Sequence, residues 1–179
     1  PAVFRSISPA WSNRNLRSLA DAVASPCIMA HVRAATAGMP VSEENCHPFQ
    51  HEAFLFMHNG HLGSFRGIRR DLLNGLSTAA FDSIRGGTDS EHLFGLFLDE
   101  WEAVNDEAPD ALARCLNRTV WRATGLVAEV GGGHPSFLNI AVTDGDRAAA
   151  CRFTDDPERR PETLYFTERP LYEPVAEGS

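Results

Sequence analysis

The chain has 179 residues and a formal net charge of −8, from 16 basic and 24 acidic side chains. All the basic residues are arginine, which excludes a P-loop lysine, a lysine Schiff base and the phosphate-anchoring lysine of kinases. An acidic chain without a basic stripe is also unsuited to nucleic-acid binding.

The first third of the chain predicts two strands on either side of one helix. Residues 2–7 are apolar and typical of a strand, and Ser12 is a candidate N-cap for a helix over 13–24. The apolar run 27–35 then predicts a buried strand, which is followed by a polar loop over 38–48.

The middle of the chain predicts one strand and a series of helices. The compact apolar run 53–57 predicts the strand, and Ser64 is placed to cap the first helix. Asp89 is a candidate N-cap for the next helix, and Pro109 suits the first turn of a third that continues to Leu126.

The last third predicts three strands, over 137–143, 148–153 and 163–167, with a hairpin turn at Asp144-Gly145. Helices do not alternate regularly with strands along the chain, so an antiparallel α+β fold is favoured over a doubly wound parallel sheet. A hydrophobic content of 43% is typical of a globular protein, and the length predicts a single domain over 1–179.

The cysteine pattern predicts reduced thiols. Cys27, Cys46, Cys115 and Cys151 are far apart and form no CxxC pair, which favours a cytoplasmic location over a secreted disulfide framework. Apolar runs stay well below the roughly 18 residues of a membrane span, and the start does not read as a secretory leader.

An arginine near the end of a predicted strand is the first candidate for function. If Arg33 is buried, it needs a partner, and its guanidinium matches a carboxylate in two parallel hydrogen bonds. Thr36 adds a hydroxyl close by. The two interpretations are an internal salt bridge and a site for a substrate carboxylate.

The Asn59-Gly60 pair follows the strand expected over 53–57. In isolation this pair predicts a tight turn. The functional alternative is an oxyanion hole, in which the amide of Asn59 and the N–H of Gly60 stabilise a negative oxygen.

Asp89 lies in the sequence GGTDSE, beside two glycines. Its carboxylate is a candidate helix cap and also a candidate partner for a substrate ammonium group. Four histidines, at 47, 51, 58 and 61, have spacings that could hold zinc, but the region reads as loop and strand, where ligands do not converge as on a helix. Cys46 is a weaker candidate for a thiol nucleophile.

Four motifs in order along the chain resemble the class-II glutamine amidotransferases, which belong to the N-terminal-nucleophile hydrolases. The resemblance is strongest to the stand-alone branch that includes the γ-glutamyl hydrolase of ergothioneine synthesis. It implies a four-layer α-β-β-α sandwich of antiparallel sheets. The motifs are AHVRAAT (30–36), PVSEENCHPF (40–49), FLFMHNG (54–60) and GGTDSE (86–91).

The resemblance assigns a role to five residues. Arg33 falls on the arginine that binds the carboxylate of glutamine, and Thr36 falls on the threonine that assists it. Asn59 and Gly60 fall on the oxyanion hole, and Asp89 falls on the aspartate that holds the substrate α-ammonium group.

The family's nucleophile is a cysteine at the mature N-terminus, whereas position 1 here is proline. We therefore expect a fragment that lacks the nucleophile and the N-terminal strands; a truncated chain and a pseudoenzyme are the alternatives. The expected reaction of the complete protein is hydrolysis of a γ-glutamyl amide through a cysteinyl thioester, without cofactor or metal.

The expected partner is a γ-glutamyl small molecule, rather than a nucleic acid or a membrane. A separate protein that accepts ammonia is an additional option. Two other functions stay open: a catalytically inactive γ-glutamyl-binding module, and a metallohydrolase built on the histidine cluster.

Overall fold

The computed structural model describes residues 1–32, 42–104, 108–130 and 133–168. None of the helices in these ranges is both long and apolar enough to cross a membrane. The elements in chain order are η1 (Ala10–Ser12), α1 (Arg14–Ala22), η2 (Glu43–Asn45), β1 (Phe49–His51), β2 (Phe54–His61), α2 (Phe65–Asn74), α3 (Thr78–Ser83), α4 (Asp89–Val104), α5 (Ala111–Val130), β3 (Phe137–Thr143) and β4 (Ala148–Thr154).

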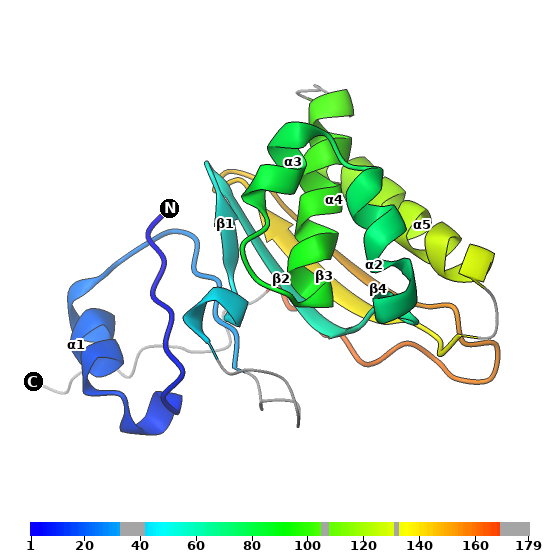
Figure 1. The fold of residues 1–179 in the computed structure, drawn as a ribbon. Helices are drawn as coiled ribbons and strands as arrows, with labels where there is room; N and C mark the ends of the chain where they lie inside the picture. Colours follow the sequence, from blue (N-terminus) through cyan, green and yellow to red (C-terminus); the bar gives the residue numbers. More distant parts are fainter. Residues whose placement is uncertain (33–41, 105–107, 131–132, 169–179) are drawn as a thin grey trace, which may run out of the picture.

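The four strands form one antiparallel sheet in the order β1-β2-β3-β4 (Figure 1). The long central pair, β2 and β3, is in register from Leu55 opposite Thr143 to His61 opposite Phe137. The predicted antiparallel sheet and its hairpin between β3 and β4 are therefore confirmed.

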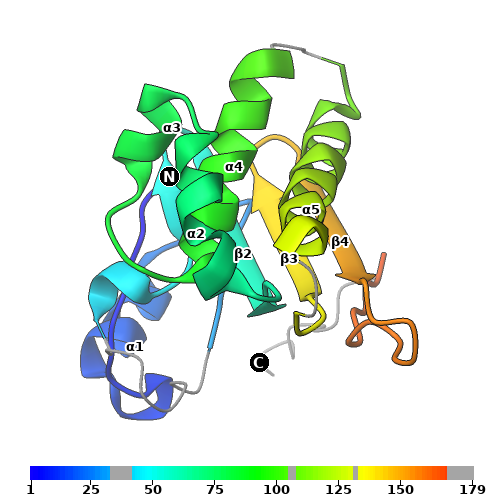
Figure 2. The same cartoon turned by 45° about the vertical axis from the view of Figure 1, so that its right-hand side comes forward.

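Helices α2 to α5 lie on one side of this sheet, as both views show (Figure 1, Figure 2). Side chains alternate between the faces of a strand, and Phe54, Phe56 and His58 of β2 point towards the helices. Phe56 packs against Phe94 and Phe97 of α4, with ring centroids 5.1 and 6.1 Å apart. These contacts form the centre of the hydrophobic core.

The N-terminal segment, which contains η1 and α1, lies to one side of the helical layer (Figure 1). It is tied to the sheet region by Arg5, whose Nε and Nη2 donate to the carbonyl of Pro48 at 3.0 and 2.7 Å. The N-cap of α1 is Asn13, which accepts a hydrogen bond from the N–H of Leu16. The prediction that Ser12 is the N-cap was wrong, because Ser12 belongs to η1 and its hydroxyl donates to the carbonyl of Pro9.

Three expected strands are not strands in the described residues: 2–7, the described part of 27–35, and 163–167. A strand requires a neighbour to satisfy its backbone groups, and an apolar run does not supply one. The segments instead make single contacts, residues 2–7 with the residues just before β1 and the other two with β3. The amide of Asn139 donates to the carbonyl of Thr163 at 3.2 Å, for example.

Two elements were missed from the sequence, the strand β1 and the helix α3. Both are short: β1 has three residues and α3 has six, too few for a periodic pattern to emerge. The last long helix also begins later than expected, because Ala111 is its first residue and Pro109 lies before it.

Candidate active site

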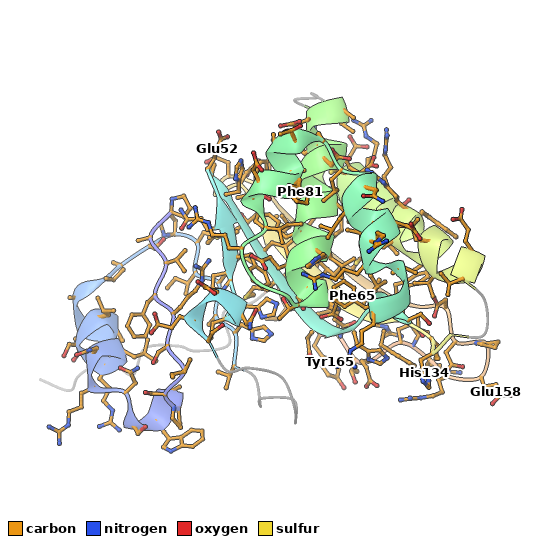
Figure 3. All side chains as sticks on the ribbon, in the orientation of Figure 1. Glu52, Phe65, Phe81, His134, Glu158 and Tyr165 are labelled. Atoms are coloured by element: carbon orange, nitrogen blue, oxygen red, sulfur yellow. The ribbon has the colours of Figure 1, made fainter. Side chains whose placement is uncertain are left out.

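A cavity of about 870 Å³ opens where β2 ends and where α2 and α4 begin. The two helices start at Phe65 and Asp89, so their N-terminal residues contribute to the lining together with the end of β2. Phe65 and His134, both labelled in Figure 3, also line it. Three of the five residues singled out in the sequence line this one cavity: Asn59, Gly60 and Asp89.

Asn59 and Gly60 lie inside β2, so the tight turn that the pair predicts in isolation is absent at this position. They pair with Asn139 and Leu138 of β3. The glycine is required for a different reason. Gly60 has φ +139°, and a Cβ atom placed on it would lie 1.8 Å from the carbonyl oxygen of Phe137. The close approach of two backbones therefore explains the glycine.

Asp89 is the first residue of α4 and not its N-cap, which corrects the sequence-based expectation. Thr88 takes the capping role, because its hydroxyl oxygen accepts a hydrogen bond from the N–H of Glu91 at 3.2 Å. The carboxylate of Asp89 instead accepts from the N–H groups of Leu62 and Ser90, each at 2.8 Å. A carboxylate has about four acceptor positions, so Asp89 retains capacity towards the cavity.

The glycines before Asp89 are held in place by Glu91. Its two carboxylate oxygens accept from the N–H groups of Arg85, at 2.9 Å, and Gly86, at 2.6 Å. A Cβ atom on Gly86 would lie 2.6 Å from the side-chain oxygen of Asn45. This turn fixes the position from which α4 starts, and thus the position of Asp89.

Two buried histidines flank the start of α4. His58 Nδ1 lies 2.9 Å from the hydroxyl of Ser90, and His92 Nδ1 donates to the carbonyl of Thr88 at 2.7 Å while its Nε2 accepts from Arg69. Burial lowers the pKa of His58 despite the attraction of Asp89. Burial also lowers the pKa of His92, and the charge of Arg69 acts in the same direction.

The contacts of His58 and Ser90 were not expected from the sequence. The available signal was the position of His58, which continues the buried alternation of Phe54 and Phe56 along β2 and so had to be buried with a partner.

Arg33 and Thr36 lie outside the residues that the structure describes. Their roles therefore stay sequence-based predictions. Val32, the residue before Arg33 in the chain, lines the cavity, as does His31.

The histidine cluster does not converge on one point. The ring of His47 stacks on His31 at 4.2 Å, His61 packs against Phe137, and His58 is directed to Ser90. Across the described ranges, no three His, Cys, Asp or Glu side chains form a group that could hold a metal ion.

All four cysteines are free thiols, as their spacing predicts. Burial raises the pKa of Cys115 to about 12, which makes it inert, and the thiol of Cys46 donates to the carbonyl of Ser42 at 3.4 Å. Neither is among the residues that line the cavity.

Comparison with known proteins shows the family to which the chain belongs. The model of the family described as class-II glutamine amidotransferases matches residues 3–160. The protein named "Probable glutamine amidotransferase DUG3" of Saccharomyces cerevisiae is 37% identical over 179 residues, which cover 93% of this chain and 50% of that protein. The gamma-glutamyl-hercynylcysteine sulfoxide hydrolase of Mycolicibacterium smegmatis is 28% identical over 170 residues, covering 93% of this chain and 62% of the hydrolase.

A solved structure is similar in both fold and sequence. The glutamine aminotransferase class-II domain protein from Silicibacter pomeroyi superposes with a TM-score of 0.70 at 33% identity, covering 87% of this chain and 62% of that chain. The chain thus spans about half of the yeast relative and about three fifths of the other two. By its sequence and its fold, the chain is a member of the class-II glutamine amidotransferase family.

Proposed function

We propose that the complete protein hydrolyses the γ-amide bond of glutamine or of a γ-glutamyl metabolite. The observation that carries this proposal is the convergence of Asn59, Gly60 and Asp89 on one cavity. A γ-glutamyl group has an ammonium, a carboxylate and a reactive carbonyl, and these residues offer partners for two of the three.

The substrate head is bound by charge. The carboxylate of Asp89, which is partly exposed and held rigidly by Leu62 and Ser90, pairs with the α-ammonium group. Arg33 and Thr36 bind the α-carboxylate in this proposal, on the strength of the family motif in which they occur. Binding both groups fixes the distance of the γ-carbonyl from the attacking group, which is the positioning contribution to the rate.

The reaction proceeds through a thioester. The thiolate of an N-terminal cysteine, which this proposal assigns to the complete protein, forms a bond to the γ-carbon, and its own α-amine takes up the thiol proton. The amide of Asn59 and the N–H of Gly60 stabilise the oxyanion. The C–N bond then breaks, the amine leaves with a proton, and water hydrolyses the thioester to glutamate and the free thiol.

The proposal extends to the architecture and to the product. We infer that the chain forms one domain within the four-layer sandwich of the N-terminal-nucleophile hydrolases, with the sheet described above as one of its two sheets. Plain hydrolysis is favoured over transfer, with ammonia passing to a separate protein as the second option. The relatives named as hydrolases of a γ-glutamyl compound support a small γ-glutamyl substrate.

The test is turnover by the full-length natural protein of L-glutamine and two truncated analogues. Glutaramic acid lacks the α-ammonium group, and 4-aminobutanamide lacks the α-carboxylate. We expect glutamine to be hydrolysed and both analogues to lose most of kcat/KM. Equal turnover of all three would overturn the proposal.

Two further results would replace the proposal with one of its rivals. Glutamine binding without turnover would identify a γ-glutamyl-binding module. Activity that is lost on chelation and restored by zinc would identify a metallohydrolase.

A further inference from the structure

The imidazole of His58 lies between the two halves of the proposed site and touches both. It is 2% exposed and extends from β2 towards the first turn of α4. Its Nδ1 lies 2.9 Å from the hydroxyl oxygen of Ser90, and its Nε2 lies 3.5 Å from the carbonyl oxygen of Phe137.

These two partners define the protonation pattern of a neutral ring. A carbonyl oxygen only accepts hydrogen bonds, so the proton of neutral His58 is on Nε2, and Nδ1 is an acceptor. The hydroxyl of Ser90 therefore donates to Nδ1. A serine hydroxyl has one proton, and in Ser90 that proton lies in the hydrogen bond to His58.

The same hydroxyl is also close to Asp89. The oxygen of Ser90 lies 3.4 Å from Oδ1 of Asp89, which already accepts from the N–H of Ser90 at 2.8 Å. While Ser90 donates to His58, this carboxylate oxygen keeps an acceptor position open for a substrate.

His58 also packs against the other half of the site. A Cβ atom on Gly60 would lie 3.2 Å from Nε2 of His58, and 1.8 Å from the carbonyl of Phe137 to which that nitrogen points. The ring therefore lies directly beside the backbone that presents the N–H of Gly60.

From these contacts we propose that His58 and Ser90 are positioning residues that keep Asp89 open for the substrate ammonium group only while His58 is neutral. The inference rests on the proposed function, because it assigns a control to the same site. When His58 takes up a proton, Nδ1 becomes a donor to Ser90. The hydroxyl proton of Ser90 then turns towards Oδ1 of Asp89 and occupies the acceptor position that the ammonium needs.

The groups around His58 determine the pH at which the ring takes up its proton, and this pH lies below the usual value for histidine. Asp89 at the start of α4 favours the protonated ring, as does the carbonyl of Phe137 on β3. His61 on the same strand and His31, which also lines the cavity, oppose it, and burial opposes it most strongly. The pKa of His58 is therefore lowered, and the ring is neutral at pH 7 and above.

The test is the Kd of L-glutamine, measured by calorimetry on the full-length natural protein between pH 5 and pH 8. We expect wild-type Kd to rise as the pH falls below 6.5, by about fivefold once His58 is protonated, since a single hydrogen bond contributes about 1 kcal/mol. Ser90→Ala should bind glutamine about as tightly as wild type does at pH 7.5, because the acceptor position of Asp89 stays open when the hydroxyl is absent. Ser90→Ala and His58→Gln should both show a flat pH profile.

Three controls separate positioning from folding. Ser90→Thr keeps the hydroxyl and should restore the pH profile. His51→Gln removes a histidine that does not line the cavity and should retain the profile. Thr119→Val removes a buried hydroxyl that bonds only within α5, and should bind glutamine as wild type does.

The outcomes distinguish this inference from the proposed function. If wild type binds glutamine and Asp89→Asn does not, but Ser90→Ala and His58→Gln keep the wild-type profile, the inference alone is overturned. It is also overturned if these two variants lower only the melting temperature. If wild type binds neither glutamine nor another γ-glutamyl amide, or if Asp89→Asn binds glutamine as tightly as wild type does, the proposed function and the inference both fail.

Discussion

The carboxylate of Asp89 accepts a hydrogen bond from the backbone N–H of Leu62 at 2.8 Å. This contact ties the start of α4 to the residue that follows β2, although 27 positions separate the two residues. The ammonium-binding carboxylate and the oxyanion-binding strand of the proposed site are therefore held at a fixed separation.

Substitution Asp89→Asn should raise the KM for glutamine by about 10- to 100-fold, since hydrogen bonds to a charged group contribute about 1.5–3 kcal/mol. Glutaramic acid, which lacks the ammonium group, should be hydrolysed equally by the variant and by wild type. Steady-state kinetics with both substrates checks this. Asp82→Asn, an exposed aspartate on α3, is the matched control and should change neither value. A loss of activity on both substrates would contradict an ammonium-specific role for Asp89.

Substitution Asn59→Ala should lower kcat by about 10²–10³-fold and change KM much less, because an oxyanion donor acts mainly in the transition state. Its control lies directly opposite on β3. Asn139 pairs with Asn59 across the sheet, and its amide donates to the carbonyls of Glu162 and Thr163. Asn139→Ala should retain kcat. The opposite pattern, with KM raised and kcat unchanged, would show that Asn59 does not donate to the oxyanion.

Substitution Gly60→Ala should destabilise the fold. The positive φ costs about 1–3 kcal/mol for a residue with a Cβ atom, and the contact with the carbonyl of Phe137 adds to this. Gly125→Ala is the contrast, because Gly125 lies in α5 with no heavy atom within 4 Å of an added Cβ. The Gly125→Ala substitution should raise the free energy of unfolding by about 0.5–1 kcal/mol. Urea unfolding of both variants measures the difference, and equal stabilities would refute the backbone argument.

The free energy of unfolding should fall as the pH drops from 7 to 5. His92 is fully buried and its pKa lies below the usual 6.5 in the folded protein, as does that of His58. The unfolded chain therefore binds more protons than the folded one below pH 6.5, and stability is lost from there towards the folded-state pKa. Carboxylates with lowered pKa values, such as Asp99, act only at lower pH and do not contribute in this window.

Urea unfolding at half-unit pH steps measures this dependence. His92→Gln should be less stable than wild type at pH 7.5, since the contacts to Thr88 and Arg69 are altered, but its stability should depend less on pH. Stability that rises on acidification would show that the two imidazoles are not held neutral by the fold.

The sequence predicts well those elements that carry their own pattern. Three helices have long periodic apolar faces: the helix that begins at Phe65, the helix that begins at Asp89, and the helix that includes Leu126. The structure confirms all three. The strands over 137–143 and 148–153 are joined by an Asp-Gly turn, which is local information, and they are also confirmed.

Elements whose identity depends on distant partners were predicted poorly. Residues 2–7 and 163–167 have the apolar composition of strands, but in the described chain they lack a ladder to join. The Asn59-Gly60 pair indicates a turn only when read locally. Its pairing with β3, some 80 positions later, keeps it within a strand. The capping role went to Thr88 because Asp89 is engaged by Leu62, a contact with no local signal.

The alternation along β2 has a consequence for comparing members of this family. Phe56 and His58 project into the core, while Asn59 projects from the opposite surface of the same strand. Inserting or deleting one residue between Phe56 and Asn59 would leave a strand that can still pair, yet would either bury the amide of Asn59 or expose the ring of Phe56. Conserved spacing between these two positions is therefore a stricter criterion for a competent catalyst than overall similarity of fold.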